Sequence, residues 1–382
     1  MEHAVRARRS DMPDDAVTLF VCGDVMTGRG IDQALPHPGS PELYESFVRD
    51  ARDYVALAEA ASGAFARPLG FAGIWGAALD ELARFDPAVR LINLETGITR
   101  HDAPWPGKGI HYRMHPDNAP CLQAARINCC ALANNHVLDW GREGLRETCR
   151  VLDELGIARC GAGEDGPAAA RPAFLEAAPG VRVLIWSIGL ADSGIPADWR
   201  ADTGQPGVWL ARKASARGAE PLAERIRAEK RPGDLAVVSI HWGGNWGYRI
   251  PAGHRAFAHL LVDAGADLVH GHSCHHPRGM ELYRGRPILY GCGDFINDYE
   301  GIRGHEEFRP DLTLMYFLRL APSTGTLLDL WMTPLRMARF TLHRTGTDDT
   351  RWLLDLINRE RHRDMPPFSL DAEGRLFLRL RH

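Results

Sequence analysis

The feature of this sequence that most constrains its fold is a series of short apolar runs that end in polar side chains. Stretches with helical periodicity separate the runs, and this alternation of strand and helix predicts a layered α/β domain. The runs and the polar residues behind them are 17–22 before Asp24, 88–92 before Asn93 and Glu95, 129–133 before Asn134, Asn135 and His136, 235–240 before His241, and 267–269 before His270 and His272. Because polar residues at strand ends build the sites of open α/β sheets, the five ends predict one shared site.

The segments between and after these runs predict the remaining elements. Helices are expected over 42–61, 73–85, 141–155, 215–229 and 253–264. A hairpin is expected over 280–290 with its turn at 284–286, and antiparallel strands over 312–320 and 327–332. We expect three parts in the chain: a flexible tail of residues 1–16, a catalytic domain of residues 17–345, and a docked helix and tail strand within residues 346–382.

Charge and apolar content restrict the partners and the compartment. The 382 residues include 45 Lys and Arg against 49 Asp and Glu, a net charge of −4 that disfavours a nucleic-acid partner. Residues 1–15 hold no apolar core of a secretory signal, and no window approaches the ~18–20 apolar residues of a spanning helix. The eight cysteines form no CxxC pair, as expected for reduced thiols. We therefore expect a cytoplasmic protein without a membrane or nucleic-acid partner.

The side chains at the five strand ends form a donor set for a metal. Together they offer carboxylates, an amide oxygen and imidazoles, a mixture that suits a divalent cation. The candidate ligands are Asp24, Glu95, Asn135, His241 and His272. Oxygen donors leave Ca²⁺ and Mg²⁺ open beside Mn²⁺ and Zn²⁺, and we expect no organic cofactor. For His136 the alternative is a hydrogen-bonded core histidine.

The order and spacing of six motifs resemble a known family. They are Gly23-Asp24 with Arg29, Asn93-Leu94-Glu95, Ala133-Asn134-Asn135-His136, Ser239 to Gly243, Gly271-His272-x-x-His275 and Pro287 to Gly291. The series resembles that of CapA-like proteins, which were named for poly-γ-glutamate capsule synthesis and belong to the calcineurin-like metallophosphoesterase superfamily. The resemblance spans about 17–334 and implies an α/β/β/α sandwich with a metal at the strand ends. It implies as ligands Asp24, Glu95, Asn135, His241, His272 and His275, with His136 as acid/base histidine.

Two positions depart from the pattern of the superfamily. Its hydrolases open with Asp-x-His, whereas Met26 here puts a thioether, a poor ligand for a hard cation, in place of the imidazole. The usual Gly-Asn-Phe of CapA-like proteins carries Asp294 in place of the amide. A carboxylate there can hold an imidazolium, so we expect Asp294 to form a proton-transfer pair with His275 or His276.

Three reactions are compatible with these residues: metal-assisted phosphoester hydrolysis, a soluble role in poly-γ-glutamate synthesis, and epimerisation. The chain also resembles the soluble CapA-like proteins of lasso-peptide pathways, which implies a peptide epimerase. Epimerisation needs proton-transfer groups on two faces of a Cα atom, which His136 and the Asp294 pair would provide. We favour a metal-dependent epimerase that inverts a Cα centre of a ribosomal, lasso-type precursor peptide, with the other two reactions as alternatives.

Substrate contacts are expected from residues near the strand ends. Trp242, Asn245 and Trp246 follow His241 in a glycine-rich loop that would cradle a peptide end, unless the aromatic rings merely pack. Arg29 and Arg249 are expected to bind a carboxylate. The loop at 105–107 is expected to cover the site. Only three lysines occur in the chain, so we expect histidine and aspartate, rather than lysine, to transfer protons.

Overall fold

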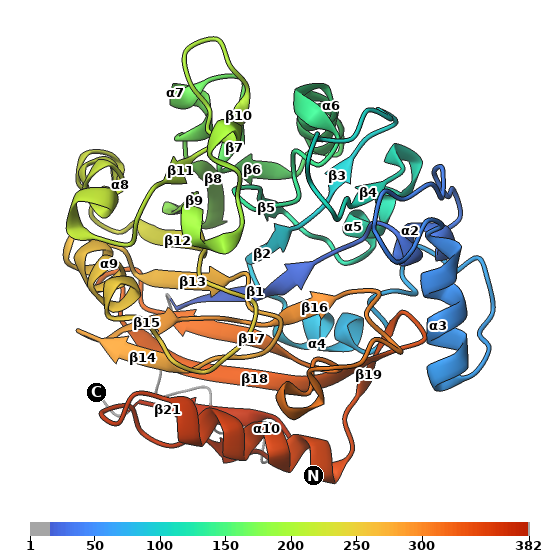
Figure 1. Ribbon diagram of the computed structural model, residues 1–382. Coiled ribbons are helices and arrows are strands. Elements are labelled where there is room, and N and C mark those ends of the chain that lie inside the picture. Colours follow the sequence, from blue (N-terminus) through green and yellow to red (C-terminus); the bar gives the residue numbers. More distant parts are fainter. Residues whose placement is uncertain (1–15, 381–382) are drawn as a thin grey trace.

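The computed structural model describes residues 16–380, in which two β-sheets pack face to face (Figure 1). The expected tail, residues 1–16, therefore lies outside the described residues except for residue 16. The larger sheet runs, in spatial order, through β20 (Ser369–Leu370), β21 (Leu376–Arg379), β18 (Leu327–Ala338), β17 (Leu312–Leu320), β1 (Val17–Val25), β2 (Val89–Leu94), β5 (Cys129–Ala131) and β6 (Ala158–Cys160). Beside this path, β16 (Asp294–Ile296) pairs with β1 and β19 (Thr341–Arg344) pairs with β18.

The second sheet carries the later strands of the chain. Its order is β11 (Leu210–Ala211), β9 (Val181–Leu190), β12 (Leu235–His241), β13 (Leu268–His272), β15 (Arg286–Leu289) and β14 (Met280–Tyr283), with β8 (Ala173–Ala178) beside β9. Two short pairs lie outside both sheets: β3 (Gly97–Ile98) with β4 (Arg113–Met114), and β7 (Ala162–Gly163) with β10 (Gly207–Val208). In both sheets the strands that lead to the polar residues are parallel neighbours, so these residues emerge at the same edge.

Helices cover the outer faces of both sheets. The helices are α2 (Gly30–Ala34), α3 (Arg52–Ser62), α4 (Ala78–Phe85), α5 (Pro120–Ala124), α6 (Gly141–Glu154), α7 (Gly166–Ala169), α8 (Ala216–Glu229), α9 (Ala252–Asp263) and α10 (Thr347–Glu360). One core cluster joins α4, α5 and α6 to the larger sheet, a second fills the space between the sheets, and a third joins α8 and α9 to the second sheet. The predicted α/β/β/α sandwich of the calcineurin-like fold is thereby confirmed.

The alternation of side chains along β12 shows how the sequence places one site residue. Leu235 and Val237 enter the core between the sheets, whereas Val238 and Ile240 pack under the helices of the outer face. Because successive side chains of a strand point to opposite faces, His241 at the end of β12 faces inward, toward the larger sheet. The strand therefore delivers an imidazole to the space between the two sheets.

A close backbone approach explains a glycine next to the site. A Cβ atom at Gly23 would lie 1.8 Å from the carbonyl oxygen of Gly293, so no larger residue fits there. Gly23 lets β1 pack beside the segment that leads into β16, and the register of the two strands sets Asp24 opposite Asp294. The sequence Gly-Asp thus brings two carboxylates from distant segments together.

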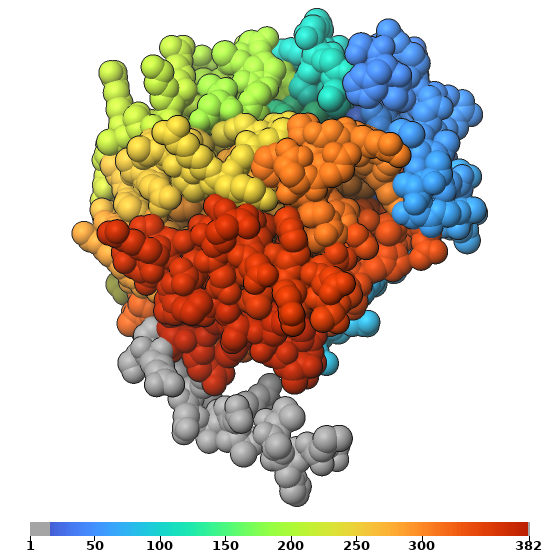
Figure 2. Space-filling view, turned by 60° about the horizontal axis from the view of Figure 1, so that its bottom comes forward, coloured from blue at the N-terminus to red at the C-terminus, as the bar shows by residue number. Residues whose placement is uncertain are grey.

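The C-terminal segment packs across one end of the sandwich, below β18 in Figure 1, and forms a broad red face in Figure 2. Strand β21 pairs with β18, where Phe377 lies opposite Trp331. Leu353, Leu356 and Ile357 of α10 enter the core between the sheets. The helix therefore closes part of the inter-sheet core that the strands leave open.

Several predicted elements agree with the structure, but two predicted helices are shorter, and the one expected over 73–85 begins only at Ala78. The hairpin over 280–290 is confirmed, with positive φ at Arg284 and Gly285 as a two-residue turn requires. The helix expected over 42–61 is shorter, because residues 41–51 form a loop closed by main-chain hydrogen bonds and α3 begins at Arg52. The hairpin of β8 and β9 was not predicted. Among the described residues no helix is long and apolar enough to cross a membrane.

Candidate functional site

Two buried carboxylates lie at the ends of neighbouring strands of the larger sheet. Asp24 is the next-to-last residue of β1 and Glu95 follows β2, and the side-chain amide of Asn93 donates to Asp24 Oδ1 and to Glu95 Oε2, at 2.8 Å each. The amide of Asn134 in turn donates to Asn93 Oδ1 at 3.0 Å, which orients the bridging amide. Burial, reinforced by the neighbouring carboxylates, raises the pKa of both acids.

Two imidazoles from the second sheet complete the group. The Nδ1 atoms of His241 and His272 are 2.9 Å apart. His241 Nδ1 lies 3.8 Å from Glu95 Oε2, and His272 Nδ1 lies 3.6 Å from Asp24 Oδ1. Asp24, His241 and His272 each present a ligand atom within 4.8 Å of the others, which makes them a candidate metal site. Four of the six ligands that the resemblance implies therefore lie together, whereas His275 pairs with Asp294 and lies outside this cluster.

The chemistry of this donor set fits a divalent cation. Burial lowers the pKa of His241 and His272, so both imidazoles are neutral, the form that binds a metal. Burial and the neighbouring carboxylates raise the pKa of the two nearby acids, and a divalent cation would favour their ionised forms. Two imidazole nitrogens 2.9 Å apart, beside a carboxylate oxygen, would therefore offer such an ion both nitrogen and oxygen ligands.

Another predicted ligand, Asn135, contacts the outer side of a histidine ring and does not face the candidate metal position. Its Oδ1 lies 3.1 Å from His241 Nε2, on the side of the ring away from Nδ1. Ser239 Oγ makes the corresponding contact with His272 Nε2 at 2.8 Å. These partners orient the rings so that both Nδ1 atoms face the carboxylates, as outer partners of metal-binding histidines commonly do.

A pocket of about 180 Å³ opens beside this candidate metal site. The residues that line it are Glu95, Lys108, Ile110, Asn135, His136, Asn245, Ser273, His275 and Tyr299. Glu95 and Asn135 connect the pocket to the metal site, so a molecule bound in the pocket would lie next to the ion. Two of the lining histidines each have a carboxylate partner.

The first of these pairs is His136 with Asp139. His136 Nδ1 lies 2.7 Å from Asp139 Oδ2, and its Nε2 lies 4.0 Å from Glu95 Oε1. Burial and the nearby Lys108 ammonium lower the pKa of His136 to about 4. The imidazole is therefore neutral at physiological pH, and with its Nδ1 proton held by Asp139 its Nε2 is free to accept a proton.

The second pair is His275 with Asp294, as predicted for one of two histidines. His275 Nδ1 lies 2.8 Å from Asp294 Oδ1, and the amide of Asn297 donates to Asp294 Oδ2 at 3.1 Å. Burial opposes protonation of His275, but the Asp294 carboxylate outweighs it and raises the pKa of the imidazole. One pocket thus holds a neutral histidine and a histidine that retains its proton to higher pH.

His276 does not share this position, which corrects its expected catalytic role. Its Nδ1 lies 3.1 Å from the carbonyl oxygen of Pro277, and its Nε2 accepts the N–H of Gly247 at 3.1 Å. The ring is fully buried and stacks on Phe308. With both nitrogens occupied, His276 supports the loop instead of transferring protons in the pocket.

Arg29 does not face the pocket, which corrects its expected role as a carboxylate clamp. Its guanidinium is buried, forms two hydrogen bonds with Asp298 and an ion pair with Glu45 at 2.8 Å, and lies over the ring of Tyr54. These partners already occupy the guanidinium N–H groups that would otherwise bind a carboxylate of the substrate. Arg29 therefore joins α2 to the segments around Glu45 and Asp298.

The loop after His241 places only one of its predicted contacts in the pocket, Asn245. Trp242 is fully buried, where it stacks on His254, and so cannot touch a substrate. Trp246 stacks on His305 and is half-buried, whereas Arg249 is exposed, and neither lines the pocket. The loop thus packs around its aromatic rings, the alternative considered for it.

Several residues of the site were not predicted. Lys108 and Asp139 lie beside His136, although proton transfer was expected to involve no lysine. Tyr299 lines the pocket and donates a hydrogen bond to the sulfur of Met26, at 3.6 Å, so the thioether that replaces the usual imidazole packs against a phenol. The spacing of His136 and Asp139, three residues apart after a strand, was a signal that could have identified the aspartate.

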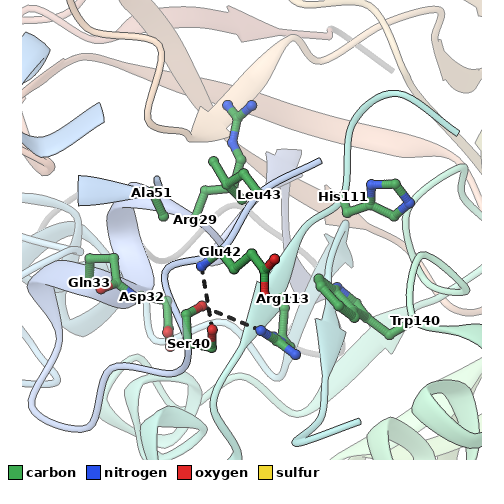
Figure 3. Close-up of a pocket in the computed structure, with 10 residues that line it drawn as sticks. All are labelled: Arg29, Asp32, Gln33, Ser40, Glu42, Leu43, Ala51, His111, Arg113 and Trp140. Carbon is green, nitrogen blue, oxygen red and sulfur yellow. Dashed lines mark hydrogen bonds between the residues drawn. The ribbon is translucent and has the colours of Figure 1, made fainter. Parts of the chain in front are cut away.

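A second hollow lies near Arg29, where Glu42, Arg113 and Trp140 approach one another (Figure 3). Its volume is about 10 Å³, which is room for about one water molecule. Arg113 lies over the ring of Trp140 and donates to the carbonyl oxygen of Ser40. This hollow is therefore too small for a substrate, and the pocket of about 180 Å³ is the candidate active site.

Comparisons with known proteins agree with the fold and the motifs. The family model described as "Bacterial capsule synthesis protein PGA_cap" matches residues 18–299. The chain is 50% identical over 346 residues to the "Probable polyglutamine synthesis accessory protein" of Mycobacterium tuberculosis, which covers 90% of this chain and 91% of the relative. It is 24% identical to the "Capsule biosynthesis protein CapA" of Bacillus anthracis, over 80% of this chain and 65% of the relative. The chain therefore belongs to the CapA-like family of bacterial capsule synthesis proteins.

Proposed function

We propose that this protein is a metal-dependent accessory enzyme in the synthesis of a polymer of glutamyl or glutaminyl residues, and that it hydrolyses an amide bond of that polymer. The names of its relatives, a polyglutamine synthesis accessory protein and a PGA biosynthesis protein CapA of Bacillus subtilis, support the class of substrate. The reaction rests on the residues of the pocket. The observation that carries it is the presence of two histidine–carboxylate pairs in one pocket beside the candidate metal site.

The two histidines suit opposite halves of the reaction. The neutral His136 would accept a proton at Nε2 from the water that attacks the amide carbon. His275, whose Nδ1 is held by Asp294, would give its Nε2 proton to the leaving amine nitrogen as the C–N bond breaks. Asp139 and Asp294 orient the rings for these transfers.

The metal and the pocket wall have separate parts in this proposal. Asp24, His241 and His272, with Glu95 beside them, would hold a divalent cation such as Ca²⁺, Mg²⁺, Mn²⁺ or Zn²⁺. When bound, it would supply positive charge that stabilises negative charge on a substrate oxygen. The side-chain amide of Asn245 also lines the pocket and offers a neutral contact for a peptide group.

The different protonation of the two histidines favours a second candidate, peptide epimerisation. A base and an acid in one pocket can remove a proton from Cα and return one to it. The thioether of Met26, which replaces a ligand of the superfamily's hydrolases, also favours chemistry with fewer metals. The two candidates use the same residues and differ in whether a bond of the peptide chain breaks.

One incubation separates the two candidates. Oligomers of γ-linked L-glutamate, γ-linked D-glutamate and α-linked glutamine are incubated with the protein and Mn²⁺ or Ca²⁺ in deuterated water. Shorter oligomers with new amino termini support hydrolysis, whereas deuterium at Cα without cleavage supports epimerisation, and either must be lost in His136→Gln with the metal retained. If the metal-loaded protein changes none of the oligomers, the proposed function is wrong.

A further inference from the structure

Lys108 occupies a position in the pocket that the proposed chemistry has not used. Its ammonium forms an ion pair with Asp139 Oδ1 at 2.7 Å, donates to the carbonyl oxygen of Ile110 at 2.9 Å and lies 3.1 Å from His136 Nδ1. The side chain is 14% exposed, so the charge is largely enclosed. Lys108 therefore touches both the residue that orients His136 and the chain segment that walls the pocket.

That segment, residues 99–112, connects β3 to β4 without helix or strand, and we call it the cover segment. Three contacts between the cover segment and the rest of the protein are made to one residue, Asp139. The N–H of Trp105 donates to the Asp139 carbonyl oxygen and the N–H of Tyr112 donates to Asp139 Oδ2, both at 2.7 Å. Together with the Lys108 ion pair, three points of the cover segment are held by one aspartate.

The same carboxylate also holds His136, so the cover segment and the imidazole are linked. Asp139 is fully buried, and burial alone opposes its ionisation. Lys108, followed by His136, outweighs burial and keeps the pKa of Asp139 below its usual range. A buried carboxylate that loses its only lysine partner is strongly destabilised, so the arrangement depends on the ammonium.

We propose that Lys108 is a positioning residue that fastens the cover segment to Asp139, and that it thereby sets both the pocket wall at Ile110 and the orientation of His136. The first half of this inference concerns the fold of the cover segment and is independent of the reaction. The second half rests on the proposed function, because it concerns a histidine that transfers protons. The experiment therefore measures the two halves separately.

The first measurement is amide hydrogen exchange of Lys108→Met, which keeps the stem and removes the charge. We expect the amides of Trp105 and Tyr112 to exchange at least about tenfold faster, while strands β1 and β12 keep their protection. Lys213→Met, at an exposed lysine, is the matched control and should change neither. Lys108→Arg should restore much of the protection because it restores the charge, and Lys108→Gln replaces the Met variant if that one does not fold.

The second measurement is turnover of whichever oligomer the wild-type protein converts. We expect kcat of Lys108→Met to fall about 10–100-fold with KM changed less than about threefold, because the substrate still binds but His136 is misplaced. Unchanged exchange in the cover segment contradicts the fastening role, and faster exchange with unchanged kcat contradicts the link to His136. If the wild-type protein converts no oligomer, the proposed function fails while the exchange result still decides the fastening role.

Discussion

His275 Nδ1 lies 2.8 Å from Asp294 Oδ1, in a pair whose carboxylate stands where CapA-like sequences usually carry asparagine. The pair joins the loop after β13 to β16, 19 residues apart in sequence, and its carboxylate is 3% exposed. An amide at position 294 would leave the imidazole without a charged partner. The type of residue at position 294 thus determines which protonation state of His275 the fold favours.

Replacement of Asp294 by Asn should therefore lower the pKa of His275 and reduce turnover at neutral pH by about 10²-fold, the scale of a lost general acid. The raised pKa of His275 contributes stability below its unfolded value of ~6.5, and that contribution is lost as pH rises through the folded pKa. The stability difference between wild type and variant should thus narrow at higher pH. Histidine NMR titration and denaturation at several pH values measure both effects, with the exposed Asp355→Asn as control. An unshifted His275 titration would contradict the pairing.

Glu81 should make the stability of the C-terminal region depend on acid pH. The carboxylate is 1% exposed and accepts hydrogen bonds from Arg375 at 2.6 Å, Arg344 at 2.5 Å and Thr333 at 2.7 Å. Burial opposes its ionisation, but Arg375 and the other partners lower its pKa. Because a depressed pKa stabilises the fold above the unfolded value, near 4.5, this stability is lost as pH falls through the folded pKa.

Glu81→Gln should accordingly reduce the free energy of unfolding by about 3–5 kcal/mol at pH 7, since it removes the charge that the buried Arg375 contacts. The loss should shrink at acid pH, as the pH falls below 4.5 and through the lowered pKa of Glu81, because the wild-type carboxylate then becomes protonated as well. Urea denaturation at both pH values measures it, and Glu224→Gln, at an exposed position, should have little effect. Equal losses at both pH values would rule out the carboxylate charge as the cause.

Removal of metal should destabilise the wild-type protein and leave a ligand variant unaffected. Adding Mn²⁺ to chelator-treated protein at about 100 times Kd contributes ~2.7 kcal/mol, and for a chain of this length we expect a rise in Tm of about 3–4 °C. Asp24→Asn should lose most of this shift, because its carboxylate is one of the three clustered donors. His259→Gln, at a partly exposed histidine paired with Glu281, should keep it. An equal shift in Asp24→Asn would place the metal elsewhere.

Arg29→Met should affect stability and not substrate binding. The substitution leaves Asp298 and Glu45 buried without their cation, a change that costs about 3–5 kcal/mol. Arg249→Met, at an exposed arginine outside the pocket lining, should change neither stability nor KM. A raised KM with unchanged stability in Arg29→Met would restore the carboxylate clamp that the structure argues against.

The sequence predicted a site residue correctly where the position of that residue at the end of its own strand determines its place in the site. His241 and His272 end apolar strands, so strand periodicity and the shared edge of parallel strands bring them together. Arg29 could not be judged in this way, because its partner Asp298 is 269 residues away. Lys108 lies in a loop without periodicity, and its ion pair with Asp139 depends on how that loop folds back.

The most direct test of the account is mass spectrometry of a γ-linked glutamate oligomer after incubation with the Mn²⁺-loaded protein in deuterated water, beside His136→Gln and His275→Gln. The account predicts that the wild-type protein shortens the oligomer, with the peptide-bond cleavage reduced at least about 10²-fold in both variants while their metal content is unchanged. Equal cleavage in wild type and both variants, or an oligomer whose mass never changes, would contradict it.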